Sequence, residues 1–511
     1  MTDSISGQDL GGRDRVGISS SLIYNQRPAA VLARKIQYVG QANNQTYEPG
    51  GLIRLEIPTS PGTFLQCGTT TLKFDFDITC AGAVANVPTA ANPSLGGVLF
   101  DSTAASLIRR IRIYSGSSLI EDIGEYSKIY ELMKDATSSS AECETTGSIE
   151  GYPNAELQQT AALPDVLLAS ANVRRQNSSV DFLTPTVAQA AAAGADDVCY
   201  QFEIPIMSGT IGTMCPKWFP LGAAGAAPLR VEIELNSNNS GVIQTVASQA
   251  VGGAGVSKSS WAVSNVEIHC DIVQLDNNAM RLVDESVGGQ YVVNTSSFRH
   301  SVANVNTGVN SSSTILPFRF SSAKAFLSRL YSQASQLTLA SNSQTGANRA
   351  GCTEFHHQIG SSHVPASNVR CGASAQSGVQ GAAPLVNTHR QWKQGAVEAV
   401  TELMKAVHGK NILQVSNRIN TTNWNRNDTP VIGGATGTTD GVNRGTFTFA
   451  VDLESQGKAS ELIENGTSTV SLLCMLNATY LPATPSAQVL HSWCMHDLRL
   501  EYVGGVCIAR F

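Results

Sequence analysis

The amino-acid sequence predicts an all-β protein whose antiparallel sheets pack face to face in two successive sandwiches. Three observations support this prediction: many short segments alternate apolar and polar residues, helical segments are few, and one order of segments occurs twice. Charged residues make up only 14% of the 511 residues, while Gly, Ser, Ala, Thr and Asn are abundant. This composition is typical of strands joined by long neutral loops.

Strict alternation is the main evidence for strands. Apolar side chains at every second position make a strand half buried, which is typical of antiparallel sheets with one face on the core. A parallel α/β fold would show continuous apolar runs between helices instead. The alternating segments are Leu72–Ile78, Tyr200–Ile204, Leu229–Leu235, Val266–Ile272, Phe447–Leu453 and Leu498–Tyr502.

Three helices are expected, and two of them belong to a repeat. Apolar residues recur at helical spacing in Gly124–Ala136 and Trp392–His408, and a shorter helix is expected at Asn278–Asp284. The first two helices share the tetrapeptide Glu-Leu-Met-Lys, at Glu131–Lys134 and Glu402–Lys405. After each come a long loop, two strands and a final strand introduced by tryptophan, so the chain is expected to contain two copies of one domain.

Several segments resemble a known family. They are LFDSTAASLIRRIRIYSGSSLIEDI (Leu99–Ile123), YQFEIPIMSGTIG followed by KWFPLG and PLRVEIELN, and FTFAVDLESQGKASELIENGTST (Phe447–Thr469). In this order they resemble the double-jelly-roll major capsid proteins of the adenovirus-like lineage of double-stranded DNA viruses, especially those of polinton-like viruses and virophages. The resemblance covers most of Gly51–Phe511 as a pattern.

The resemblance implies a fold and an assembly. It implies two consecutive eight-stranded jelly rolls, at residues 45–288 and 289–511, after an N-terminal arm at residues 1–44. Three copies would form a pseudo-hexagonal homotrimer that tiles an icosahedral virion shell, together with minor capsid and penton proteins. The arm is expected to contact neighbouring subunits or an internal membrane. No cofactor, metal or catalytic residue is implied.

Two groups of residues are candidates for contacts between subunits. Trp218 and Phe219 interrupt the alternating pattern and could anchor a loop on a neighbour; the alternative is that they belong to the domain core. Arg109, Arg110 and Arg112 form the densest basic cluster. Intersubunit salt bridges or a solvated strand edge are favoured for them over genome contact, because the net charge of -6 does not suit phosphate binding.

The loops and cysteines complete the expectations. The segments Thr137–Val198, Ser237–Ser260 and Ser335–His389 lack alternation and are expected at one end of the molecule or along its flanks. The eleven cysteines are widely spaced, so they are expected to be buried free thiols of a protein made in a reducing compartment. Met1–Arg15 shows no secretory signal, and no apolar run is long enough for a membrane span.

Catalytic and metal-binding functions are not supported by any motif. The sequence contains no nucleophile elbow, phosphate-binding loop or His-Glu-x-x-His pattern. Glu354, His356, His357 and His363, flanked by Cys352 and Cys371, have irregular spacings that do not suit zinc. An enzyme is therefore not expected.

Three other functions stay open at this point. A β-sandwich carbohydrate-binding or adhesion protein would need exposed aromatic residues, yet aromatics make up only 6% of the chain. A glycoside hydrolase would need a pair of carboxylates, and none is singled out by the sequence. An RNA-virus capsid protein of tandem jelly rolls would be expected to carry a basic arm.

Overall fold

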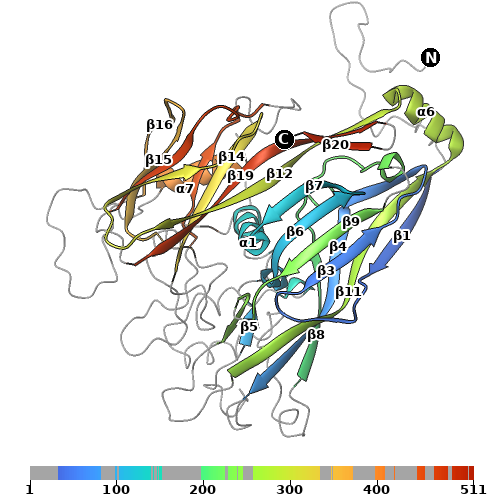
Figure 1. The fold of residues 1–511 in the computed structure, drawn as a ribbon, viewed down its shortest axis with the longest axis horizontal. Coiled ribbons are helices and arrows are strands. Elements are labelled where there is room, and N and C mark those ends of the chain that lie inside the picture. Colours follow the sequence, from blue (N-terminus) through green and yellow to red (C-terminus); the bar gives the residue numbers. More distant parts are fainter. Residues whose placement is uncertain are drawn as a thin grey trace, which may run out of the picture.

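The computed structural model shows two β-sandwiches side by side, joined by a short helix (Figure 1). The predicted loops Thr137–Val198, Ser237–Ser260 and Ser335–His389 lie largely outside the described residues. The structure describes residues 33–81, 98–100, 103–139, 142, 147, 149–151, 197–224, 228–238, 240–244, 257–333, 347, 349–371, 397–408, 419, 446–454, 465–480, 486–503 and 506–510.

The first sandwich consists of two antiparallel four-stranded layers. One layer has the order β1-β11-β4-β8 and the other the order β3-β9-β6-β7. Its strands are β1 (Ala33–Gln41), β3 (Leu52–Ile57), β4 (Thr63–Ala81), β6 (Ile108–Ser115), β7 (Ser118–Gly124), β8 (Asp197–Pro205), β9 (Leu229–Leu235) and β11 (Ser257–Leu275). The short strands β2 (Thr46–Tyr47), β5 (Val98–Phe100) and β10 (Val242–Gln244) extend or flank these layers.

The second sandwich repeats this arrangement. Its layers have the orders β12-β19-β14-β17 and β13-β18-β15-β16. Its strands are β12 (Gln290–Val305), β13 (Ser311–Leu316), β14 (Ala323–Ser332), β15 (Cys352–Ile359), β16 (Ser362–Arg370), β17 (Phe449–Asp452), β18 (Cys474–Tyr480) and β19 (Gln488–Val503). The short strand β20 (Val506–Arg510) pairs with β19.

Both sandwiches have the jelly-roll topology. When the eight long strands of each are lettered B to I in chain order, both pack a B-I-D-G sheet against a C-H-E-F sheet. We call them the first roll and the second roll. The predicted fold class, two consecutive eight-stranded jelly rolls with a few short helices, is therefore confirmed.

The helices lie close to the positions predicted for them. They are α1 (Tyr126–Thr137), α6 (Asn277–Val287) and α7 (Val397–His408). Helices α1 and α7 both connect strand F to strand G, so the shared Glu-Leu-Met-Lys sequence marks the same place in each roll. Helix α6 connects the rolls: the Asp276 side chain accepts a hydrogen bond from the amide of Asn278 at its start, and Gly288 (φ 67°) ends it.

Strand β1 lies within residues 1–44, which the sequence predicted as an arm. It pairs with β11 from Ala33 opposite Leu275 to Gln41 opposite Glu267. Only Gly40 of β1 is fully buried; Ile36 and Tyr38 are partly buried, and the other side chains of the strand are exposed. With so few buried positions, the strand shows only a short apolar alternation in the sequence. Residues 1–32 are outside the described part of the chain.

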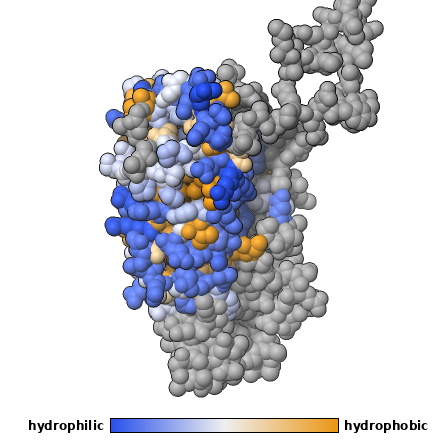
Figure 2. All heavy atoms as spheres, turned by 90° about the vertical axis from the view of Figure 1, so that its right-hand side faces the viewer, coloured by the Kyte–Doolittle hydropathy of each residue, from blue (hydrophilic) through white to orange (hydrophobic). Residues whose placement is uncertain are grey.

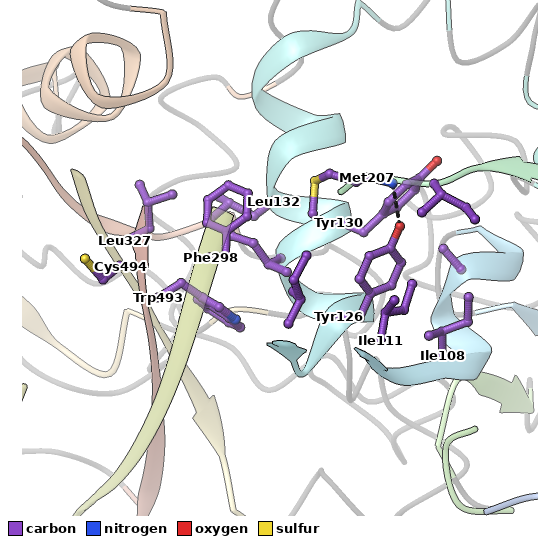
Figure 3. Packing of buried hydrophobic residues seen from close by; sticks show 14 of the residues in the cluster. Ile108, Ile111, Tyr126, Tyr130, Leu132, Met207, Phe298, Leu327, Trp493 and Cys494 are labelled. Carbon is purple, nitrogen blue, oxygen red and sulfur yellow. Dashed lines mark hydrogen bonds between the residues drawn. The ribbon is translucent and has the colours of Figure 1, made fainter. Parts of the chain in front are cut away.

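The two rolls share one continuous hydrophobic core. In β4 of the first roll, Phe74 and Phe76 are buried while the residues between them are partly exposed, as alternation predicts. In the second roll, β14 and β19 are buried along most of their length without alternation. Figure 3 shows the reason: residues of α1 lie between the first roll and the sheet that contains β14 and β19. Both faces of that sheet are therefore covered.

None of the helices among the described residues is long and apolar enough to cross a membrane.

Candidate assembly interfaces

The interface between the rolls is built from a few elements of each. The first roll contributes β7, α1 and the first part of the loop between β8 and β9, residues 206–219 (the 206–219 loop). The second roll contributes the B-I-D-G sheet, mainly β12, β14 and β19. Tyr126 of α1 ties two of the first-roll elements together, because its hydroxyl accepts a hydrogen bond from the amide of Met207 at 2.8 Å (Figure 3).

A buried carboxylate, Glu121 of β7, is the most densely hydrogen-bonded group in this interface. It accepts bonds from the Ser208 hydroxyl at 2.5 Å, the Gly209 amide at 2.9 Å, and the Thr210 amide and hydroxyl at 3.1 and 2.5 Å. A fifth bond, at 2.6 Å, comes from the hydroxyl of Ser297 in β12 of the second roll. A buried charge is tolerated when it is fully hydrogen-bonded, as it is here. Glu121 thus connects β7, the 206–219 loop and the second roll.

The neighbouring Asp122 joins the rolls through arginines. Arg110 donates two hydrogen bonds to its carboxylate, at 2.7 and 2.8 Å, in a bidentate arrangement. Arg299 of β12 donates a third at 2.8 Å. Burial opposes ionisation of this carboxyl, but the hydrogen bonds of Arg110 and the charges of Arg110 and Arg299 outweigh it and lower the pKa of Asp122. The pKa of Arg110 is raised, chiefly by the same hydrogen bonds.

Helix α1 supplies a second ionic connection. Asp135 lies 3.7 Å from a guanidinium nitrogen of Arg329 in β14, and both side chains are almost fully buried. Arg329 also donates to the hydroxyl of Thr448 at 3.0 Å. Two turns earlier in α1, the Lys128 ammonium lies 5.5 Å from the ring centre of Tyr331, a cation–π contact across the interface.

A polar cavity of about 420 Å³ opens between the rolls. His300 and His491 stack in it with ring nitrogens 3.0 Å apart, and the indole nitrogen of nearby Trp493 donates to the carbonyl of Gly124 at 3.2 Å. Burial lowers the pKa of His300 to about 4 and that of His491 well below its usual value. Both imidazoles are therefore neutral at pH 7. The lining residues are Arg109, Arg110, Asp122, Gly124, Glu125, Glu234, Arg299, His300, Val302 and His491.

Trp218 and Phe219, predicted together as an intersubunit anchor, have different environments. Phe219 is fully buried; its ring meets Tyr502 edge to face at 5.6 Å, and its backbone bridges to Leu65. Phe219 thus has no surface to offer a neighbour, and its contacts match the alternative of a core residue. Trp218 is half exposed (50%), and contact with another subunit stays a prediction for it.

The predicted basic cluster is paired with acids of the same chain. Arg109 contacts Glu234 at 3.0 Å, and Arg112 lies 3.5 Å from Glu232. With Arg110 on Asp122, each arginine of the cluster has an acidic partner within the first roll. Arg109 and Arg110 line the cavity between the two rolls, so the cluster supports the junction inside one chain. A contact of these arginines with a second subunit stays a prediction.

No metal site is formed within the described part of the chain, where no group of three potential ligands comes together. His356 and His363 stack at 4.6 Å between ring centres, while His357 is fully buried between aromatic rings. Burial lowers the pKa of His357 to about 3. The eight cysteines whose side chains the structure describes are free and buried, as expected for small apolar residues.

Sequence reasoning missed the residues that join the rolls: Glu121, Asp135, Arg329, His300, His491 and Trp493. Part of the signal was present. Strand β14 reads AKAFLSRLYS, an almost continuous apolar run in which Arg329 is the exception. A run of this kind predicts a strand covered on both faces, and a charge within it predicts a buried partner. Glu121 could not be recognised in this way, because acidic residues on the outer faces of other strands have the same spacing from their apolar neighbours.

Comparison with known proteins gives structural matches alone. No protein-family model matches the sequence, and no curated protein matches it either. A chain in the cryo-EM structure of the Sputnik virophage aligns over 99% of this chain and 95% of its own, with TM-score 0.55 and 9% identity. The major capsid protein of mavirus aligns over 97% and 93%, with TM-score 0.52 and 10% identity. A chain of the PBCV-1 virus capsid aligns over 96% and 100%, with TM-score 0.53 and 10% identity. The chain therefore shares, over nearly its whole length, the double jelly-roll fold of these proteins.

Proposed function

We propose that this chain is a major capsid protein that assembles as a pseudo-hexagonal homotrimer and tiles the icosahedral shell of a DNA virus. One observation carries the proposal: the B-I-D-G and C-H-E-F topology occurs twice in one chain, and both copies together align with the mavirus and PBCV-1 proteins over more than nine tenths of the chain. The proposed location is the virion, and the proposed role is structural.

The interface between the rolls supports this function. A shell subunit must hold its two rolls at one angle, because each presents surfaces to different neighbours. The buried hydrogen bonds of Glu121 and the Asp135–Arg329 ion pair are directional, so they favour one relative orientation of the two rolls. A hydrophobic contact alone would hold the orientation less strictly.

The domain division belongs to the proposal as well. We assign residues 45–288 to the first roll and 289–511 to the second, and residues 1–44 to an arm whose last part, β1, completes the first roll. Minor capsid and penton proteins are the proposed further partners, with an internal membrane near the arm. No nucleic-acid sequence is proposed to be recognised.

The test is the assembly state of the purified chain. Mass photometry should give a particle of three chains, and negative-stain microscopy should show a hexagonal outline with three-fold symmetry. The subunits of such assemblies often have no stable isolated form, so dilution should produce few folded monomers. A well-folded monomer at all concentrations would contradict the proposal, and binding of that monomer to a glycan array would favour the adhesion alternative.

A further inference from the structure

One of the contacts between the two rolls brings strand F of the first roll, β7, against strand B of the second, β12. Glu121 of β7 bonds Ser297 of β12 at 2.6 Å, and Asp122 of β7 bonds Arg299 of β12 at 2.8 Å. Both strands lie at the edges of their own sheets and belong to different sheets. The contact is therefore made by side chains and does not continue a hydrogen-bonded ladder.

The chain contains the same two kinds of edge a second time, and among the described residues no further strand pairs with the outer side of either one. Strand F of the second roll is β16, and strand B of the first roll is β1; each is an edge strand. From Ile120 to Ile123, β7 is buried or nearly so, whereas from Ala366 to Asn368 β16 is fully exposed. Strand β1 buries only Gly40. An exposed edge strand is a surface that proteins normally cover.

The loops between strands G and H differ in the same way. In the first roll this loop is buried against the second roll: Gly209 is bonded to Glu121, and the Thr295 hydroxyl of β12 donates to the carbonyl of Met214 at 3.3 Å. In the equivalent loop of the second roll, Val470, Leu472 and Leu473 have exposed fractions of 54%, 42% and 52%. These apolar side chains belong to the loop of the second roll that corresponds in chain order to the buried loop of the first.

The exposed apolar loop is continuous with the exposed strand. The amide of Gly360, in the turn that leads into β16, donates to the carbonyl of Leu473 at 2.8 Å. Leu472 lies against the same glycine. We name the surface formed by β16, Val470, Leu472 and Leu473 the free F edge. Isolated exposed leucines are ordinary, but an apolar group beside an uncovered edge strand marks an interaction surface.

The two edge strands β16 and β1 cannot meet within one chain. Strand β16 lies at one end of the long axis of the molecule and β1 at the other (Figure 1). The side of the first roll that carries β1 is mainly hydrophilic with small apolar patches, as expected for a surface that stays soluble before assembly (Figure 2). Two different surfaces at opposite ends of a subunit make a heterologous contact, which closes into a ring when the rotation allows it.

We infer that the free F edge docks against β1 of a second copy of this chain, repeating between chains the contact that β7 makes with β12 within one. The inference rests on the proposed capsid function and deepens it by assigning the surfaces of the trimer. Pro365 lies within β16 and has no amide hydrogen, so this edge is poorly suited to extend a ladder. The contact between copies is made by side chains, as it is between β7 and β12.

Photo-crosslinking in the full-length protein tests which surfaces meet. Benzoylphenylalanine replaces Ser367, an exposed residue of β16, in a mixture of unlabelled and ¹⁵N-labelled chains. We expect crosslinks of mixed isotope composition that contain the tryptic peptide Ile36–Arg54, which includes most of β1. The same probe at Leu282 of α6, which is 55% exposed, is the control and should not capture that peptide. Capture of β16 of the second copy would overturn the inference, because it indicates a two-fold contact.

A charge variant gives a readout that does not depend on crosslinking chemistry. The double substitution Leu472→Asp with Leu473→Asp should raise the dissociation constant of the oligomer about tenfold or more, while the variant chain still folds. Leu282→Asp is the matched control and should leave the oligomer intact. Intact trimers in the double variant would overturn the docking inference while leaving the capsid proposal in place. A wild-type protein that never oligomerises would overturn both.

Discussion

Replacing Glu121 with glutamine should loosen the junction between the two rolls more than any other isosteric change in the interface. The carboxylate receives five hydrogen bonds, of which four come from the 206–219 loop and one from Ser297 of the second roll. All five donors point inward at a residue that is only 2% exposed. Glu121→Gln keeps the size of the side chain and changes only its charge and its hydrogen-bonding capacity.

The magnitude follows from counting acceptors. A glutamine amide has one acceptor oxygen, and its NH2 group can donate to the hydroxyls of Ser208, Thr210 and Ser297 but not to a backbone amide, so either orientation leaves the amide of Gly209 or of Thr210 without its acceptor oxygen. A buried donor without a partner costs about 1–3 kcal/mol. The remaining bonds lose their charge assistance as well, and we expect a total loss of about 2–4 kcal/mol in the free energy of unfolding. Ser297→Ala removes only the bond between the rolls and should cost about 1–2 kcal/mol.

The measurement combines calorimetry with hydrogen exchange. Calorimetric unfolding of the two variants and the double variant gives the coupling between Glu121 and Ser297, and faster amide exchange is expected in the loop at Gly209 and Thr210. A change below about 0.5 kcal/mol for Glu121→Gln would refute the reasoning, because ordinary surface substitutions fall within that range. Additive effects of the two substitutions would show that the bond between the rolls is not formed.

Three further changes probe the same interfaces. Asp135→Ala should cost about 3–5 kcal/mol in unfolding free energy, because Arg329 then keeps a buried charge without its acid. Acidification should destabilise the fold through His300, because its imidazole binds a proton below about pH 6.5 in the unfolded chain but only below about pH 4 in the folded chain. The free energy of unfolding should therefore fall by about 3 kcal/mol between pH 6.5 and pH 4. The substitution His300→Asn should remove this part of the pH dependence. Trp218→Ala should weaken the oligomer with the unfolding free energy unchanged, whereas Phe219→Ala should cost about 3–5 kcal/mol of unfolding free energy.

For each of these changes, a different result would contradict the expectation. A stable Asp135→Ala protein would mean that the pair with Arg329 carries no weight in the fold. If the pH profile of His300→Asn matched that of the wild type between pH 4 and 6.5, another group would be responsible for the acid sensitivity. Equal effects of the Trp218 and Phe219 substitutions on unfolding would contradict the division between a surface residue and a core residue.

Local patterns in the sequence predicted most of the fold. Alternation located β9 at its observed bounds, Leu229–Leu235, and identified the central parts of β4, β8 and β11. This succeeds because the side chains of a strand with one buried face must alternate whatever packs against it. Strand β1 was missed, since an edge strand with few buried residues carries no such constraint.

The site residues were harder to predict because their roles depend on what lies across an interface. Arg110 and Asp122 are adjacent in space through the β6–β7 hairpin, which sequence could suggest, but Arg299 joins them from the other roll, 177 residues away along the chain. Sequence also placed Trp218 and Phe219 together as one anchor. Adjacent residues often face opposite ways, and here one is half exposed while the other is fully buried.

The repeated motifs show where local information ends. The recurrence of a helix with Glu-Leu-Met-Lys at corresponding places in the two halves could be predicted from the sequence. The environments of its two glutamates could not: Glu131 is fully buried and bonded to the hydroxyl of Thr103 at 2.5 Å, while Glu402 pairs with Lys405 on its own helix at 2.7 Å. The helix follows from local spacing of apolar residues; the environment of each glutamate follows from the neighbour that covers it.

The two tryptophans, predicted to introduce the last long strand of each roll, lie inside β11 and β19, and their environments differ for the same reason. The indole of Trp261 packs on Phe76 inside the first roll and bonds the carbonyl of Asn238 at 3.3 Å. That of Trp493 reaches out of the second roll to the carbonyl of Gly124 in the first. Strand formation was determined by the sequence, because it depends on neighbouring residues. The face that each tryptophan presents was decided by the packing of one roll on the other, because a sheet covered on both sides accepts apolar side chains on either face.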